Sequence, residues 1–192
     1  QEIPDLPSDA QSLADQALAE THGITRTFQA LLQIAQLEGG TPRSRFEPVD
    51  LCDIAATFAD IYEPAADEHN RTFTLNLPDT PVLVSGDRAL LGPLLANLLE
   101  NALRHTPVGS GISLSLQHNR ETILSLRDHG PGIPEAEHQN VLRRLYRLEQ
   151  SRTTQGSGLG LSLVAAIAEL HGARLTLSDA KPGLQVEVAF SG

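Results

Sequence analysis

Several residue types and patterns are scarce or missing in this chain. It has a single cysteine and neither methionine nor tryptophan among its 192 residues. One cysteine excludes an internal disulfide and a cysteine-ligated metal cluster, and Cys52, which follows Leu51 in an apolar stretch, is expected to be a small core residue. No run approaches the roughly 18 apolar residues of a membrane span, and no signal peptide is visible. Because no initiator methionine is present, we expect the chain to be a piece of something longer.

Positive charge is also scarce. Lysine and arginine number 14 against 24 aspartates and glutamates, which gives a formal net charge of −10. General nucleic-acid binding requires a basic face, so we expect no nucleic-acid partner. A hydrophobic share of 40% and a charged share of 20% are ordinary for a globular protein. The length predicts one main domain with an appendage.

The first forty residues are expected to form one long helix. Ser8 or Asp9 is a suitable cap, and the pattern continues to about Glu38, where Gly39 and Gly40 end it. Such a helix spans about 45 Å and needs a partner, which is either a second chain in an intermolecular bundle or this chain's own globular part. Apolar residues at alternating spacings of four and three make one stripe on it: Leu13, Ala17, Ile24, Phe28, Leu31, Ala35 and Leu37.

Helices and strands alternate through residues 41–192. Helices are expected at 51–68, where Asp50 is the cap, at 87–105 and at about 158–171. Alternating apolar residues predict strands at 45–49, 71–77, 81–84, 173–177 and 184–190, and a hairpin formed by 112–117 and 122–127. This mixture predicts an α+β fold, a two-layer sandwich with helices on one face of a sheet.

Two asparagines stand four residues apart on the helix predicted at 87–105. Asn97 and Asn101 therefore share a face, and Arg104 and His105 continue near it one turn later. Carboxamides among leucines are costly to bury without partners. A carbonyl oxygen of Asn101 is a suitable ligand for Mg²⁺, which keeps water and phosphate oxygens as its other ligands. The alternative is that both asparagines satisfy backbone groups at a helix surface.

Two glycine-rich turns follow this helix along the chain. Asp128 ends an apolar strand, where its carboxylate can accept a hydrogen bond from an exocyclic amine, and Gly130 and Gly132 let the backbone approach a planar base. Taken alone, this segment is a common turn. The second turn, Gly156-Ser-Gly158-Leu-Gly160, precedes a helix, where backbone N–H groups and the helix dipole suit a phosphate. It lacks the preceding strand of a dinucleotide-binding fold and the Lys-Ser/Thr of a Walker loop.

A long polar segment, residues 133–155, separates the two turns. It exceeds the usual loop length, which favours a functional lid. Its arginines form a local basic excess in an acidic chain: Arg143, Arg144, Arg147 and Arg152. They are expected either to meet triphosphate charge or to lie on a solvated loop helix.

As an ordered set, these segments resemble the catalytic ATP-binding domain of sensor histidine kinases, in the gyrase, heat-shock chaperone, histidine kinase and MutL superfamily. The stretch from Gly86 through Asn97-Leu-Leu-Glu-Asn101-Ala to Pro107 looks like the N box. Asp128-His-Gly130-Pro-Gly132 resembles the first glycine box, and Gly156-Ser-Gly158-Leu-Gly160-Leu the second. The resemblance covers residues 41–192 and implies a Bergerat-type fold with a mixed sheet.

The resemblance implies ATP and Mg²⁺ as cofactors and assigns roles residue by residue. Asn101 would ligate Mg²⁺ with Asn97 nearby, Asp128 would read adenine beside Gly130 and Gly132, and Arg104 would approach the phosphates. His105 would stack near the base. The triphosphate and the hinge of the lid would be framed by Gly156, Gly158, Leu159 and Gly160, with Arg144 and Arg147 contributing from the lid. Residues 141–147 match the family's phenylalanine box, except that Leu142 and Leu145 replace both phenylalanines.

Residues 24–40 are similar to the second helix of the family's dimerisation and phosphotransfer domain. We therefore expect residues 1–40 to be part of that domain, without the helix that bears the phospho-accepting histidine; His22 lacks the acid and the proline that follow that residue. The resemblance implies a response-regulator partner and a parent that dimerises through the N-terminal helix. It also implies a cytoplasmic location, without membrane contact by this segment, in a membrane sensor.

The expected activity is phosphoryl transfer from ATP to a histidine, because Asn97 stands where the superfamily's hydrolases have a glutamate base and an amide cannot accept a proton from water. Without the acceptor helix, this segment is expected to bind Mg-ATP but not to autophosphorylate. Three alternatives stay open: a degenerate regulatory or dimerising module, a serine kinase, and an ATPase of the same superfamily.

Overall fold

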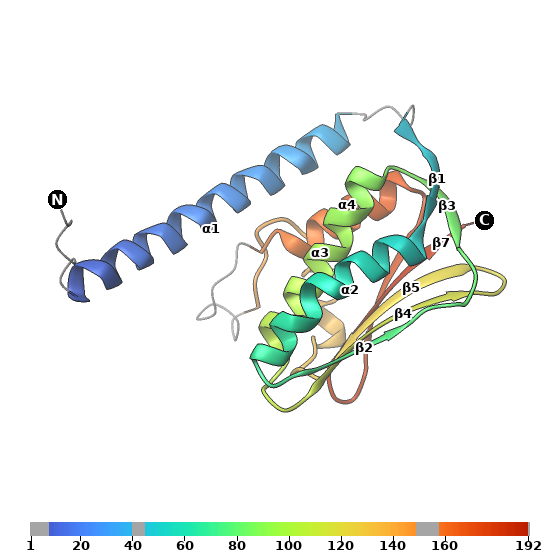
Figure 1. The fold of residues 1–192 in the computed structure, drawn as a ribbon. Helices are drawn as coiled ribbons and strands as arrows, with labels where there is room; N and C mark the ends of the chain where they lie inside the picture. Colours follow the sequence, from blue (N-terminus) through green and yellow to red (C-terminus); the bar gives the residue numbers. More distant parts are fainter. Residues whose placement is uncertain (1–7, 40–44, 149–157, 192) are drawn as a thin grey trace, which may run out of the picture.

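The computed structural model describes residues 8–39, 45–148 and 158–191 (Figure 1). The helices are α1 (Ser8–Glu38), α2 (Leu51–Glu68), α3 (Arg88–His105) and α4 (Gly160–Leu170), with a 3₁₀ turn at Glu135–Glu137. The strands are β1 (Glu47–Asp50), β2 (Thr72–Asn76), β3 (Leu83–Gly86), β4 (Gly111–His118), β5 (Thr122–Asp128), β6 (Arg174–Asp179) and β7 (Leu184–Phe190). No helix in these ranges is both long and apolar enough to cross a membrane.

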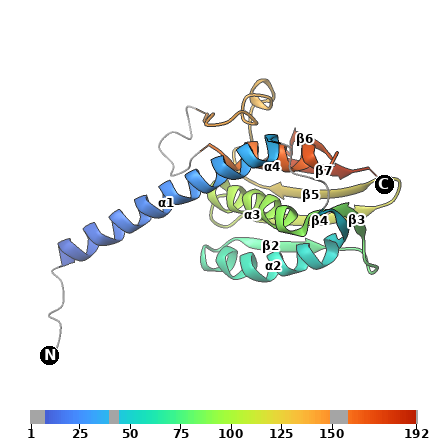
Figure 2. The same cartoon turned by 90° about the horizontal axis from the view of Figure 1, so that it is seen from above.

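The main sheet has five strands in the order β2-β4-β5-β7-β6. It is mixed, because β2 runs parallel to β4 while the other neighbours are antiparallel. Buried residues alternate along β4 and β5 and are mostly aliphatic, as Ile112, Leu114 and Leu126 illustrate, so one face of the sheet is largely apolar. Helices α2, α3 and α4 lie side by side over that face (Figure 2). The predicted α+β sandwich is confirmed.

The predicted elements are present, with small shifts at their ends. Asp50 and Asp87 cap α2 and α3 by accepting hydrogen bonds from the N–H groups of Cys52 and Ala89, each at 2.9 Å. The helix predicted from 158 begins two residues later, at Gly160. Strands β1 and β3 do not join the main sheet but pair with each other in a small antiparallel sheet. Cys52 is half-buried against the core.

The two ends of α1 have different surroundings. Ile34 and Leu37, near its C-terminal end, are buried in the same apolar core as α3 and α4. Farther towards the N-terminus Leu13, Ile24 and Phe28 are 61–71% exposed, on the part of α1 that extends away from the body of the molecule (Figure 1). The C-terminal end of α1 therefore packs on this chain's own globular part, whereas the exposed N-terminal part leaves its apolar stripe open to a second chain.

Candidate functional site

The two asparagines of α3 lie against the first turn of α4. A Cβ atom added at Gly160 would stand 3.2 Å from both Asn97 Oδ1 and Asn101 Nδ2, so the absence of a side chain at Gly160 lets the two helices meet here. Asn97 donates from Nδ2 to the carbonyl oxygen of Pro93 at 2.8 Å. This bond fixes the amide so that its carbonyl oxygen is presented towards α4.

The turn that leads into α4 is held against the segment before it. Gly158 has a φ of +70°, and its carbonyl oxygen accepts a hydrogen bond from the N–H of Leu145 at 3.1 Å. A Cβ at Gly158 would approach Tyr146 O to 2.8 Å and Arg147 Cγ to 2.9 Å. Leu159 is completely buried and anchors the turn in the core. Gly156 and Arg152 lie outside the described residues.

Asp128 is the last residue of β5 and is almost buried, at 8% exposure. Its Oδ1 accepts hydrogen bonds from the N–H of Gly130 at 2.7 Å and from the N–H of Leu184 at 3.3 Å. Oδ2 accepts none from the described residues. Oδ1 is thus engaged by two backbone N–H groups, and Oδ2 remains as an acceptor for a ligand.

His105 ends α3 beside this turn. A Cβ at Gly130 would come within 2.7 Å of the carbonyl oxygen of His105, so the two backbones are in close contact. The pKa of His105 is lowered from 6.5, chiefly because burial disfavours the charged ring and also because the guanidinium groups of Arg104 and Arg147 repel it; Asp128 opposes the shift. Burial and the two guanidinium groups therefore favour the neutral form of the ring.

The arginines predicted to meet phosphate have different positions. Arg147 and Arg104 are both near enough to His105 to lower its pKa. Arg104 also lines a shallow recess between the ends of α2 and α3, together with Arg71 and His69. Arg144 is exposed on the segment predicted to form the lid.

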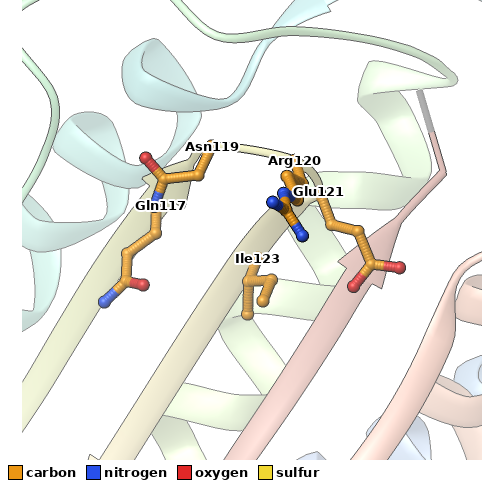
Figure 3. Close-up of a pocket in the computed structure, with 5 residues that line it drawn as sticks. All are labelled: Gln117, Asn119, Arg120, Glu121 and Ile123. Atoms are coloured by element: carbon orange, nitrogen blue, oxygen red, sulfur yellow. The ribbon is translucent and has the colours of Figure 1, made fainter.

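A second surface recess lies away from this site. It is lined by Gln117, Asn119, Arg120, Glu121 and Ile123, at the tip of the β4–β5 hairpin (Figure 3). Asp128 stands at the opposite end of β5, about 20 Å away at the usual rise of a strand. The recess belongs to the tip of the sheet and has no part in the arrangement around α3.

The polar groups around α3 fit a nucleotide whose phosphates supply most of the ligands of the bound metal. No group of three or more histidine, cysteine or acidic side chains among the described residues can hold a metal ion. Asn101 offers a neutral carboxamide at the position that Gly160 leaves open, and a hard cation with few protein ligands is typical of Mg²⁺ bound with phosphates. The available acceptor of Asp128 suits an amino group at the base end.

The fold and these residues define an ATP-binding domain built on a carboxamide-bearing helix and two glycine turns. A family model described as "Histidine kinase-, DNA gyrase B-, and HSP90-like ATPase" matches residues 86–191, more than half of the chain. The chain belongs to this family. Its relatives are sensor kinases: it is 35% identical to the probable sensor histidine kinase TcrY of Mycobacterium tuberculosis over 95% of its length, and 32% identical to the sensor protein kinase PmrB of Pseudomonas aeruginosa over 86%.

Solved structures agree with this placement. The mycobacterial sensor histidine kinase MprB matches 76% of this chain and 96% of its own, with a TM-score of 0.66 at 28% identity. The Acinetobacter baumannii histidine kinase AdeS matches 99% of this chain and 86% of its own, with a TM-score of 0.74; at 22% identity it shows the fold alone. The chain spans 38% of TcrY and 34% of PmrB, about a third of these relatives.

Sequence reasoning missed two features of the site. One is the contribution of the β6–β7 turn, where Leu184 donates its N–H to Asp128 across 56 residues. The bond from Asn97 to Pro93 was also missed. Its signal was available, because an asparagine four residues after a helical proline can reach that residue's carbonyl group.

Proposed function

We propose that this chain binds Mg-ATP at the site around α3 and is the phosphoryl-donor part of a sensor histidine kinase. Its activity would be transfer of the γ-phosphate to a histidine of the dimerisation domain. The observation that carries the proposal is the convergence of Asn97, Asn101, Asp128 and the start of α4 on the C-terminal half of α3 in a chain of this family. The named sensor kinases among its relatives support the same activity.

Each residue has a role that its chemistry permits. Asp128 accepts a hydrogen bond from the adenine amine, Asn101 gives its carbonyl oxygen to Mg²⁺, and the N–H groups at the start of α4 face the phosphates. Arg104 and Arg147 add positive charge. Bound Mg²⁺ neutralises charge on the phosphates. The ring of His105 stacks on the base.

Transfer to histidine is favoured over hydrolysis by the state of Asn97. A hydrolase needs a base that takes a proton from the attacking water. Asn97 is an amide whose NH₂ group is already donated to Pro93, and Glu100, the nearest acid on α3, accepts instead from Tyr62 of α2 at 3.5 Å. Neither group is available to activate water on the side of α4.

The test is a calorimetric titration of the chain with Mg-ATP. The wild type should bind, and Asp128→Asn should weaken binding by about 30- to 100-fold, because the lost acceptor leaves the base amine facing another amide donor. Asp60→Asn, an exposed acid on α2, is the matched control and should bind normally. A folded wild type that binds no nucleotide would favour a degenerate regulatory module.

Two further assays separate the enzyme classes. With an acceptor dimerisation domain supplied, γ-labelled ATP should give an acid-labile phosphoprotein; an acid-stable phosphoserine would favour a serine kinase. Steady-state hydrolysis by the chain alone should stay near background. Substantial turnover that survives Asn97→Ala would instead favour an ATPase.

The proposal extends to the domains and their partners. Residues 1–40 belong to a dimerisation domain and residues 41–192 form the catalytic domain, which acts in the cytoplasm and supplies phosphate for a response regulator. The exposed stripe that includes Ile24 and Phe28 is the surface for a second copy. Ile24→Glu should therefore weaken self-association in light scattering, whereas Ile61→Glu, 59% exposed on α2, should not; equal behaviour would contradict this assignment.

A further inference from the structure

The turn between β6 and β7 lies directly against the carboxylate expected to read the base. The turn is closed by a hydrogen bond from Ala180 N–H to Gly183 O at 2.9 Å. Gly183 has a φ of +102°, and a Cβ there would overlap the carbonyl oxygen of Asp128 and approach His129 Cα to 2.9 Å. On the other side, a Cβ at Gly132 would stand 3.0 Å from Gly183 O. The backbone of Gly183 is thus wedged against the segment from Asp128 to Gly132.

The same turn holds the carboxylate itself. Leu184, the first residue of β7, donates its N–H to Asp128 Oδ1, the oxygen that also accepts from Gly130. Two donors on one oxygen fix the rotation of the carboxylate, so Oδ2 has a defined direction. If the turn moves away, Asp128 loses one of these donors and its side chain gains rotational freedom.

A third contact ties the turn to the strand that carries Asp128. Arg127 donates from Nη2 to the carbonyl oxygen of Ala180 at 3.0 Å. Its Nε is buried and has no hydrogen-bond partner among the described residues. Arg127 is therefore held at this position at some energetic cost, and its contact with the turn is one that substitution can remove without touching Asp128.

From these contacts we propose that the β6–β7 turn, residues 180–184, is a positioning element that sets the preference of the site for a 6-aminopurine over a 6-oxopurine. Gly183 lets the turn approach Asp128, and the N–H of Leu184 aims Oδ2 at the amine. A fixed acceptor is repelled by the 6-oxo group of guanine, whereas a carboxylate that rotates freely discriminates less. This inference rests on the proposed nucleotide-binding function.

The experiment compares the dissociation constants of Mg-ATP and Mg-GTP for the 192-residue chain. The wild type should prefer ATP, and Gly183→Ala should reduce the ATP-to-GTP preference by about tenfold, equivalent to one hydrogen bond of the site. Gly172→Ala is the matched control. Gly172 also has a positive φ, of 66°, but no atom lies within 4 Å of its added Cβ, and it follows α4 at the end opposite the site. Its substitution should lower the melting temperature without changing the preference.

Arg127→Gln tests the turn even where Gly183→Ala does not fold, and should reduce the preference a few-fold. An unchanged preference in the folded variants overturns the inference, as does an equal reduction in Gly172→Ala, which would indicate general loosening. Failure of the proposed function is distinguishable: then the wild type itself binds neither nucleotide. If Asp128→Asn abolishes the preference for ATP while Gly183→Ala and Arg127→Gln keep it, the inference about the turn is overturned and the proposed role of Asp128 stands.

Discussion

The two ends of the proposed nucleotide site are built differently. The base turn, residues 128–132, is held by two strands and a helix: Asp128 by Leu184 of β7, His129 by a hydrogen bond from its Nδ1 to Gly111 O of β4 at 2.8 Å, and Gly130 by contact with α3. Glycine occupies the positions where two backbone segments come closest, as at Gly130 and Gly183. The base end is therefore a formed part of the folded core.

Residues 138–148, the part of the predicted lid that we call the lid segment, are held mainly by local bonds. Val141, Arg143 and Tyr146 donate their N–H groups to carbonyl oxygens three or four residues back, and Tyr146 donates its hydroxyl to Glu137 at 2.5 Å. Leu145 has a φ of +60° although it is not glycine, and it is 60% exposed. The difference indicates that the fold fixes the turn proposed to recognise the base, whereas the segment proposed to meet the phosphates has low local stability.

The largest effect is expected from breaking the base turn. Gly130→Ala places a Cβ 2.7 Å from His105 O and 2.8 Å from Asp128 Oδ1, so backbone must shift. We expect the free energy of unfolding to fall by about 1–3 kcal/mol and ATP affinity to fall at least tenfold, measured by urea denaturation and calorimetry. In the control Gly109→Ala the new Cβ has no neighbour within 4 Å, and affinity should be retained. Equal losses in both variants would contradict a base turn that is specifically packed.

A smaller effect is expected at the lid. Leu145→Gly relieves a left-handed backbone that costs about 1–2 kcal/mol but adds the entropy cost of glycine, about 0.5–1 kcal/mol. Because the side chain is mostly exposed, the free energy of unfolding should change by less than about 1 kcal/mol. Leu145→Ala keeps the strain and removes the side chain, so it serves as the comparison in the same urea titrations. A loss at Leu145→Gly as large as that of Gly130→Ala would show that the two ends are built alike.

The base end also shows how far the sequence could be used for prediction. The cap at Asp50, the shared face of Asn97 and Asn101, and Asp128 at the end of β5 follow from local spacing, and the structure has all of them. The support from Leu184 does not, because it joins residues 56 apart through strand pairing. Local periodicity contains no information about which strands become neighbours, and for the same reason the separate pairing of β1 with β3 was not foreseen.

The smallest effect is expected at His105, where the two ends meet. Asp128, from the base turn, raises the pKa of this histidine, while Arg147, from the lid segment, lowers it. Asp128→Asn should therefore lower the pKa further, and Arg147→Gln should bring it closer to 6.5, as followed by NMR titration of the ring. His69→Gln, at the exposed end of α2, leaves both neighbours in place and should not move the titration of His105.

The same shift makes stability depend on pH with a definite sign. Because the pKa of His105 is below 6.5 in the folded state, the unfolded chain binds the proton more readily as the pH falls below that value. His105 thus costs stability progressively from pH 6.5 down to its folded pKa, and His105→Gln should remove this part of the pH dependence of the urea midpoint. If Arg147→Gln leaves the pKa of His105 unchanged while Asp128→Asn lowers it, the ring responds to the base turn alone. The lid segment would then lie farther from His105 than its contact with Gly158 implies.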